Sequence, residues 1–178
     1  MGFHPVLPAE WPELASIGRS AVVVEGDAVG ALEQACSGAE VPRGELVVWA
    51  WAFDRAFERV VLVDHPRFGA LLPPGGRVEP GEDPRSAALR ELHEETGLAG
   101  SLVDERPALL DVVRGSTPEH GEFQTFGLAF AVVADPSSPL DGEPGQQPAW
   151  VSLARQPERV VVHHWRRVQA YVASRGRP

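Results

Sequence analysis

The sequence predicts an α/β fold in which a mixed β-sheet lies between two helices. Three observations predict it: β-forming segments recur along the chain, a polar helix with clear end signals lies near the middle, and an amphipathic helix closes the chain. The 178 residues are enough for one domain with a substantial core, whereas two full domains would be cramped.

The predicted strands are rich in β-branched and aromatic residues. They cover residues 20–25, 45–53, 59–64, 101–105, 109–114, 123–134 and 150–153. Residues 115–122, which are polar, and residues 135–148, which are rich in Pro and Gly, are predicted to be loops. Apolar residues at helical spacing predict the closing helix over about 157–174.

Residues 1–44 are predicted to form an accessory extension that packs on a main domain of residues 45–178. The extension would contain the strand over 20–25 and a helix over Asp27–Ser37, capped by Asp27 and ended by Gly38. It could cover an exposed sheet edge, contribute to a dimer or line a substrate cleft.

The helix near the middle of the chain has a signal at each end. Asp83 can act as the N-cap, Pro84 suits the first helical position, and Gly97 is a natural left-handed stop. These signals predict a helix over Pro84–Thr96.

Three carboxylates share one side of this helix. Glu91, Glu94 and Glu95 fall within one stripe, because residues three and four positions apart are neighbours on a helix surface. Like charges so close together are unfavourable unless a divalent cation lies among them. Oxygen ligands without Cys or His suit Mg²⁺, or Mn²⁺ in its place, better than Zn²⁺. The glycines at Gly75 and Gly76 would let backbone carbonyls approach the same ion.

The pattern around these glutamates resembles the Nudix box, the signature of the Nudix hydrolases. It consists of Gly76, Glu82 after five residues, and residues 90–98 (RELHEETGL) after seven more, with no departure at any defining position. The box covers 23 residues, and the fold that the resemblance implies, an α/β/α sandwich with a mixed sheet between the box helix and the C-terminal helix, would extend from about Glu45 onward.

The resemblance implies a hydrolase that cleaves the pyrophosphate linkage of a nucleoside diphosphate joined to another moiety, using magnesium bound on the box helix. Carried over by position, Glu91 and Glu95 would be the principal metal ligands, and Glu94 would be a further ligand or the base. The carbonyl of Gly75 or Gly76 would complete the inner shell.

Two more residues of the box receive roles from the resemblance. Arg90 would orient the glutamates through a salt bridge, and Glu82 would hold water in the outer shell. The alternative for the glutamates is an ordinary solvated helix face, and for Arg90 an intrahelical pair with Glu94 that is compatible with the functional role.

The sequence indicates the substrate less directly, because Nudix hydrolases select their substrates through loops outside the box. Residues 112–116 lack the proline typical of ADP-ribose hydrolases and the tyrosine typical of diadenosine polyphosphate hydrolases. This disfavours both subfamilies and leaves a nucleoside triphosphate, oxidised or not, or a nucleotide sugar.

Four residues outside the box are candidate substrate-binding residues. Arg67 and Arg114 could clamp phosphate bidentately, although an arginine near a strand end is more often simply exposed. Glu119 and Glu122 could supply an extra acidic ligand or base, against the alternative of a solvated turn.

Charge and composition limit the partners. The net charge of −9 argues against broad contact with duplex nucleic acid, whose binding requires many basic side chains, and favours a small phosphorylated substrate bridged by cations. No apolar run approaches a membrane span and no secretory signal is evident, so a cytoplasmic protein is expected. A homodimer is left open.

Two other functions share this fold. A nucleotide-binding sensor would bind metal and ligand without turnover, but sensors of this kind usually have lost box glutamates and none is missing here. An isomerase of isoprenoid diphosphates would need a cysteine near the cleft, and Cys36, the single cysteine, lies far upstream in a short predicted helix.

Overall fold

The computed structural model of the chain describes residues 13–37, 43–66, 68–118 and 121–175. The helices are α1 (Leu14–Arg19), α2 (Ala28–Cys36), α3 (Pro84–Thr96) and α4 (Val162–Ser174). The strands are β1 (Val23–Val24), β2 (Arg43–Phe53), β3 (Arg59–His65), β4 (Ala70–Leu72), β5 (Gly75–Arg77), β6 (Gly100–Leu102), β7 (Leu109–Thr117), β8 (Gly121–Ala134) and β9 (Gln147–Ser152).

The strands of the described residues form one mixed sheet with the order β1-β7-β8-β2-β3-β4. Three short strands lie off this path, because β5 pairs with β2, β6 with β8 and β9 with β3. At the centre, β2 and β8 run parallel from the Arg43–Phe123 pair to the Phe53–Val133 pair. This parallel pair is the frame on which the other strands and both long helices are placed.

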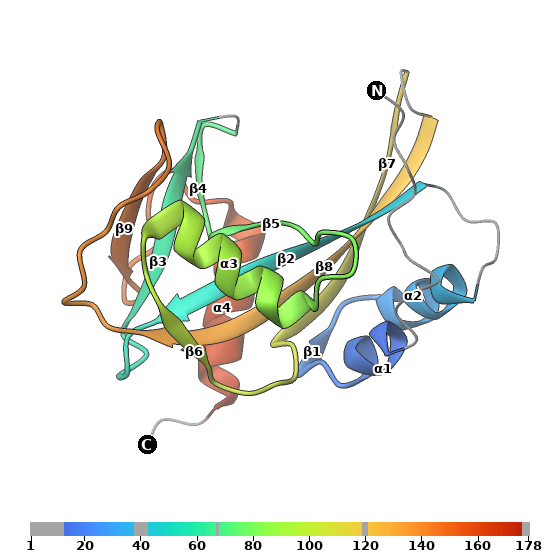
Figure 1. Cartoon of the computed structure of the whole chain (residues 1–178), viewed down its shortest axis with the longest axis horizontal. Coiled ribbons are helices and arrows are strands. Elements are labelled where there is room, and N and C mark those ends of the chain that lie inside the picture. The colour runs from blue at the N-terminus through green and yellow to red at the C-terminus, as the bar shows by residue number, and fades with distance from the viewer. Residues whose placement is uncertain (1–12, 38–42, 67, 119–120, 176–178) are drawn as a thin grey trace.

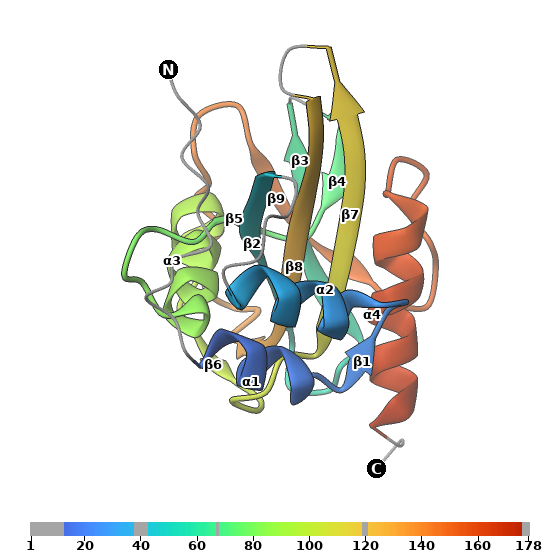
Figure 2. The same cartoon turned by 90° about the vertical axis from the view of Figure 1, so that its right-hand side faces the viewer.

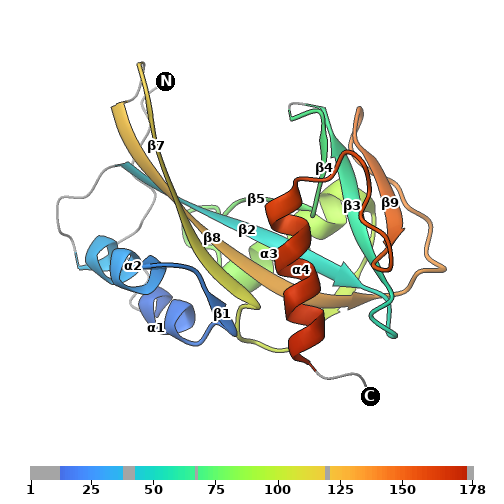
Figure 3. The same ribbon diagram turned by 180° about the vertical axis from the view of Figure 1, so that it is seen from behind.

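The sheet is covered by a helix on each face. Successive side chains of β2 alternate between two cores: Val48 and Ala50 lie in the core that contains Leu92 of α3, whereas Trp51 lies in the core that contains Trp165 of α4. Figure 1 shows α3 in front of the sheet, and Figure 3, from behind, shows α4 across the other face. The predicted α/β/α sandwich is confirmed.

The segment before β2 is joined to the sheet. β1 pairs in parallel with β7, with Val23 opposite Leu109, and α1 and α2 lie beside each other next to the sheet (Figure 2). Leu14 and Leu32 of these helices belong to the same core as α3. The segment therefore shares the core of the main sheet.

The predictions for this segment are correct only in part. The predicted strand over 20–25 shrinks to Val23–Val24, and α1 was not predicted because its six residues carry no cap signal. The predicted helix over Asp27–Ser37 is present as α2, but the Asp27 side chain makes no capping hydrogen bond. Gly38, the predicted stop, lies outside the described residues.

Two later predictions are also corrected. Residues 115–122 are not a long loop, because β7 continues to Thr117, which is opposite Gly121 at the start of β8. Polar side chains are compatible with a strand whose backbone is paired and whose face is open to water. The closing helix begins at Val162 because the preceding residues bond to β4: Leu71 N–H donates to the Arg159 carbonyl at 2.9 Å.

None of the described helices combines the length and the continuous apolar character that a membrane crossing requires.

Candidate active site

Helix α3 places the glutamate stripe beside β5. At its start, an Asp83 carboxylate oxygen accepts from the backbone N–H of Arg85 at 2.8 Å, and at its end Gly97 adopts a φ of 72°. Ala88 and Leu92 are fully buried against the sheet. The predicted bounds of the helix are confirmed, and the face next to the buried one carries the glutamates.

Glu95 is the most buried of the three. It is 7% exposed, and each carboxylate oxygen accepts one hydrogen bond: Oε2 from the N–H of Gly75 at 3.0 Å and Oε1 from Nε2 of Gln146 at 2.9 Å. Burial raises the pKa of the Glu95 carboxyl, although these two bonds act in the opposite direction. A nearby cation would relieve the cost of burying this charge.

Glu91 lies directly against the backbone of β5. A Cβ atom on Gly76 would lie 2.3 Å from Oε1 of Glu91, so only glycine leaves room for the carboxylate in this position. Burial raises the pKa of Glu91, and the charges of Glu95 and Glu94 act in the same direction. Two partly desolvated carboxylates thus lie next to two consecutive glycines.

Arg90 holds the remaining acidic residues of the box. Its guanidinium donates to both carboxylate oxygens of Glu82, at 2.8 and 2.9 Å, and to Glu91 and Glu94, each at 2.9 Å. Hydrogen bonds from Arg90 lower the pKa of Glu82, and the same bonds raise the pKa of Arg90. Glu94 is the most open of these partners, with 46% of its side chain exposed.

The two glycines present their backbones differently. Ala50 N–H donates to the Pro74 carbonyl at 2.8 Å, so the next pair, Trp49 with Gly75, occupies a position without hydrogen bonds in the antiparallel β2–β5 ladder. The N–H and the carbonyl of Gly75 therefore both point away from β2, and the N–H meets Glu95. The Gly75 carbonyl points to the same side of β5 as this N–H.

The donor set suits a hard divalent cation, although the side chains are not gathered around one point. Among the described residues, no three His, Cys, Asp or Glu side chains are arranged to hold one ion. Glu91 and Glu95 provide carboxylate oxygens beside the backbone of Gly76 and Gly75, and carboxylate and carbonyl oxygens are the ligands that Mg²⁺ and Mn²⁺ prefer. Glu94 is held by Arg90 through its Oε2 at 2.9 Å.

Gln146 was not predicted from the sequence as a site residue. Gln146 is the last residue of a turn: its N–H donates to the Glu143 carbonyl at 2.9 Å, and Gly145 within the turn has a φ of 92°. Pro144 and Gly145 occupy the positions that a type II turn favours for Pro and Gly. The Pro-Gly pair could have revealed the turn. Nothing in the sequence reveals that Gln146 contacts Glu95, which lies 51 residues away along the chain.

Neither of the two candidates outside the box that the structure describes is brought to it. Arg114 is exposed and donates to both carboxylate oxygens of Asp27 in the N-terminal segment, at 3.0 and 2.9 Å. Glu122 is exposed near the start of β8, opposite Ser116. Arg67 and Glu119 lie outside the described residues.

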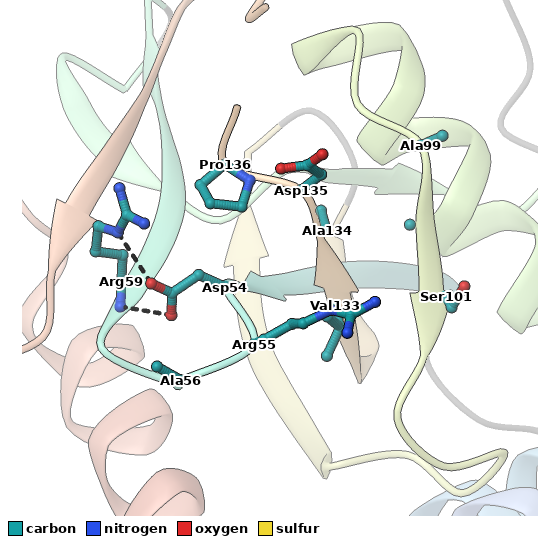
Figure 4. Close-up of a pocket in the computed structure, with 11 residues that line it drawn as sticks. Asp54, Arg55, Ala56, Arg59, Ala99, Ser101, Val133, Ala134, Asp135 and Pro136 are labelled. Atoms are coloured by element: carbon teal, nitrogen blue, oxygen red, sulfur yellow. Dashed lines mark hydrogen bonds and ion pairs between the residues drawn. The ribbon is translucent and has the colours of Figure 1, made fainter. Parts of the chain in front are cut away.

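A cavity of about 820 Å³ opens at the carboxyl ends of the parallel strands β2 and β8. Figure 4 shows Asp54 and Arg55, which follow β2, across from Asp135, which follows β8. Asp54 and Arg59 both line this cavity, and the Asp54 carboxylate accepts a hydrogen bond from Nε of Arg59 at 2.9 Å. The described residues that line this cavity include none of the box glutamates, so the cavity is separate from the candidate site.

Parts of the chain are similar in sequence to known proteins. The chain is 37% identical over 65 residues to RNA pyrophosphohydrolase of Erythrobacter litoralis (strain HTCC2594), covering 36% of this chain and 40% of that protein. It is 55% identical over 40 residues to Nudix hydrolase 25 of Arabidopsis thaliana, covering 22% of this chain and 23% of that protein. The chain thus spans less than half the length of either relative.

The fold is similar to that of a solved structure, a NUDIX-family hydrolase from Clostridium perfringens. The TM-score is 0.52 at 20% sequence identity, and the match covers 71% of this chain and 97% of the other. The family model of the NUDIX domain matches residues 45–171, from β2 to the last turns of α4. The chain therefore belongs to the Nudix family.

Proposed function

We propose that this protein is a Mg²⁺-dependent hydrolase that cleaves the pyrophosphate linkage of a nucleoside diphosphate joined to another moiety. The substrate class is a nucleoside triphosphate, oxidised or not, or a nucleotide sugar. The observation that carries the proposal is that, within a complete box, the Glu91 and Glu95 carboxylates lie against the backbone of Gly76 and Gly75.

Glu91, Glu95 and the Gly75 carbonyl would hold the cation. A bound divalent cation neutralises the anionic oxygens of a pyrophosphate and makes a water molecule more acidic. The N–H of Gly75 fixes one oxygen of Glu95, and the Cα of Gly76 leaves the space that the Glu91 carboxylate fills. Gly75 is favoured over Gly76 as the carbonyl ligand because its backbone polar groups face away from β2.

Arg90 and Glu82 would keep the acidic face in position. The bidentate pair with Glu82 fixes the plane of the guanidinium, and the same guanidinium then orients Glu91 and Glu94. Glu94 is half exposed, and its only hydrogen bond among the described side chains is with Arg90. It is therefore the carboxylate best able to move and accept a proton from water, which is the role of the base.

The reaction class also agrees with the name of one relative. The protein of Erythrobacter litoralis is an RNA pyrophosphohydrolase, and the region that it shares with this chain is short. A pyrophosphate linkage is therefore the part of its chemistry that we carry over. The net charge of −9 favours a substrate that arrives with its own cations.

A panel of nucleoside triphosphates, oxidised nucleotides and nucleotide sugars, incubated with the protein and Mg²⁺, tests the proposal. Analysis of the products by mass should show a nucleoside monophosphate together with pyrophosphate or a phosphorylated second moiety, and chelation of the metal should abolish the products. Ligand-induced thermal stabilisation without any product across the panel would instead identify a nucleotide sensor.

A further inference from the structure

We propose that Gln146 is a positioning residue for Glu95, and that it couples the segment 141–146 to the cation site. The inference rests on the proposed function, because Glu95 matters to catalysis only if it binds the cation. It concerns a residue outside the box, in a loop that the sequence alone does not connect to the site.

The two hydrogen bonds to Glu95 come from two segments far apart in the sequence. Gly75 donates to Oε2 from β5, and Gln146 donates to Oε1 from the segment before β9. A carboxylate held at one oxygen can still rotate about that contact, whereas a donor on each oxygen fixes its plane. Gln146 therefore provides the second of two constraints on Glu95.

The backbone of Gln146 is itself anchored. Its N–H closes the turn with Glu143, and Asp141 N–H donates to the Thr96 carbonyl at the end of α3, at 2.9 Å. Gly142 lies so close to the helix that a Cβ on it would be 2.6 Å from the Glu95 carbonyl oxygen. The segment thus follows the last turn of α3 and delivers the amide to the carboxylate.

The amide of Gln146 is used on one side only. Its Nε2 binds Glu95, while its Oε1 is buried and has no hydrogen-bond donor among the described residues. Such an unsatisfied acceptor destabilises the fold. Removing the whole amide takes away this unsatisfied acceptor, but it also removes one favourable bond and leaves Oε1 of the buried Glu95 carboxylate without its donor, so a moderate loss of stability is expected. A change in cation affinity, and not a change in stability, therefore distinguishes the positioning role from a purely structural one.

Gln146→Met tests the proposal, because methionine keeps an unbranched side chain of similar length without the amide. The matched control is Gln147→Met at the next position, where the side chain is exposed at the start of β9. Three quantities are measured on the full chain without substrate: the Kd for Mn²⁺ by electron paramagnetic resonance, the ¹⁵N–¹H resonance of Gly75, and Tm.

For Gln146→Met, the Kd for Mn²⁺ should rise about 10- to 100-fold, the range typical of lost outer-shell partners. The Gly75 resonance should shift, because Glu95 is no longer held in one plane. Tm should fall by a few degrees, because the buried Glu95 carboxylate loses one donor. Gln147→Met should match the wild type in all three quantities. With a substrate, kcat should fall for Gln146→Met while KM stays unchanged.

Two results would overturn the inference. One is a wild-type Mn²⁺ affinity and an unmoved Gly75 resonance in Gln146→Met. The other is a lowered Tm with wild-type Mn²⁺ affinity, which would limit Gln146 to folding. Glu91→Gln, measured in parallel, separates this inference from the proposed function. If Glu91→Gln keeps both Mn²⁺ affinity and hydrolysis, the proposed function fails; if only Gln146→Met behaves as wild type, the positioning role alone fails.

Discussion

Acidification should destabilise the protein through His164, a buried residue of α4. The imidazole is 7% exposed, lies edge-on to Trp49 with ring centroids 4.9 Å apart, and has no partner for Nδ1 among the described residues. Burial lowers the pKa of His164 from 6.5 to about 3. The unfolded chain therefore takes up a proton near pH 6.5, and the folded chain does not until about pH 3.

The sign and size of the effect follow from this difference in pKa. Because the unfolded state binds the extra proton, the stability from this group is complete above pH 6.5 and is lost as the pH falls towards 3. One unit of pKa difference corresponds to about 1.36 kcal/mol, so the loss between pH 7 and pH 4.5 is about 2.5 kcal/mol.

Urea unfolding of the wild type and of His164→Phe at both pH values measures this loss. Phenylalanine keeps a ring beside Trp49 and cannot take a proton, while the other titrating groups are shared by the two proteins. The variant should therefore lose about 2.5 kcal/mol less than the wild type on acidification. His163→Phe, at the exposed neighbouring position, should keep most of the wild-type loss. Equal losses for the wild type and His164→Phe would refute the reasoning.

Four further predictions concern one box glutamate, the two glycines beside the glutamates, and an ion-pair cluster elsewhere in the fold. Glu94→Gln should lower kcat by about 10²- to 10⁴-fold with an unchanged circular dichroism spectrum, and an unchanged rate would remove this residue from the mechanism. Gly76→Ala should push the Glu91 carboxylate aside and lower kcat about 10- to 100-fold, with little change in urea stability. Gly75→Ala should instead cost about 1–3 kcal/mol of stability, because its Cβ would lie 2.3 Å from a backbone oxygen of β2; equal stabilities for the two alanine variants would contradict this. Arg167 of α4 forms ion pairs with Glu25 and with the buried Asp111. Arg167→Met leaves both carboxylates without their cation and should lower the free energy of unfolding by about 3 kcal/mol in urea, and a wild-type value would show that these ion pairs contribute nothing.

The sequence predicts the helix of the site better than its surroundings, for a physical reason. Asp83 accepts from the N–H two residues later and the Gly97 N–H donates to the His93 carbonyl four residues earlier, so both effects are visible in the local sequence. The stripe of glutamates follows from helical spacing alone. Gln146 contacts Glu95 because a turn, the bond from Asp141 to the end of α3 and the antiparallel pairing of β9 with β3 bring distant parts of the chain together, and no local pattern records that contact.

The same limit explains the errors at the ends of elements. Polar residues 115–122 suggest a loop, but backbone pairing continues through Thr117 and Gly121 because the register set by the apolar part of β7 and β8 extends outward. The predicted start of α4 was too early because Arg159 bonds to β4, a tertiary contact that overrides helical spacing. The predicted roles of the box residues themselves stay predictions until the variants above are measured.

The turn before β9 has a consequence for how the chain can vary in length. Asp141 is fixed to the end of α3 and Gln146 to the Glu95 carboxylate, so the spacing between these two residues is set at both ends. An insertion or deletion inside 142–145 would move the amide off its partner, whereas residues 136–139 lie upstream of both anchor points. The fold and the site should therefore tolerate insertions, deletions and inserted tags in residues 136–139, whereas the same changes in residues 142–145 should disrupt the contact with Glu95.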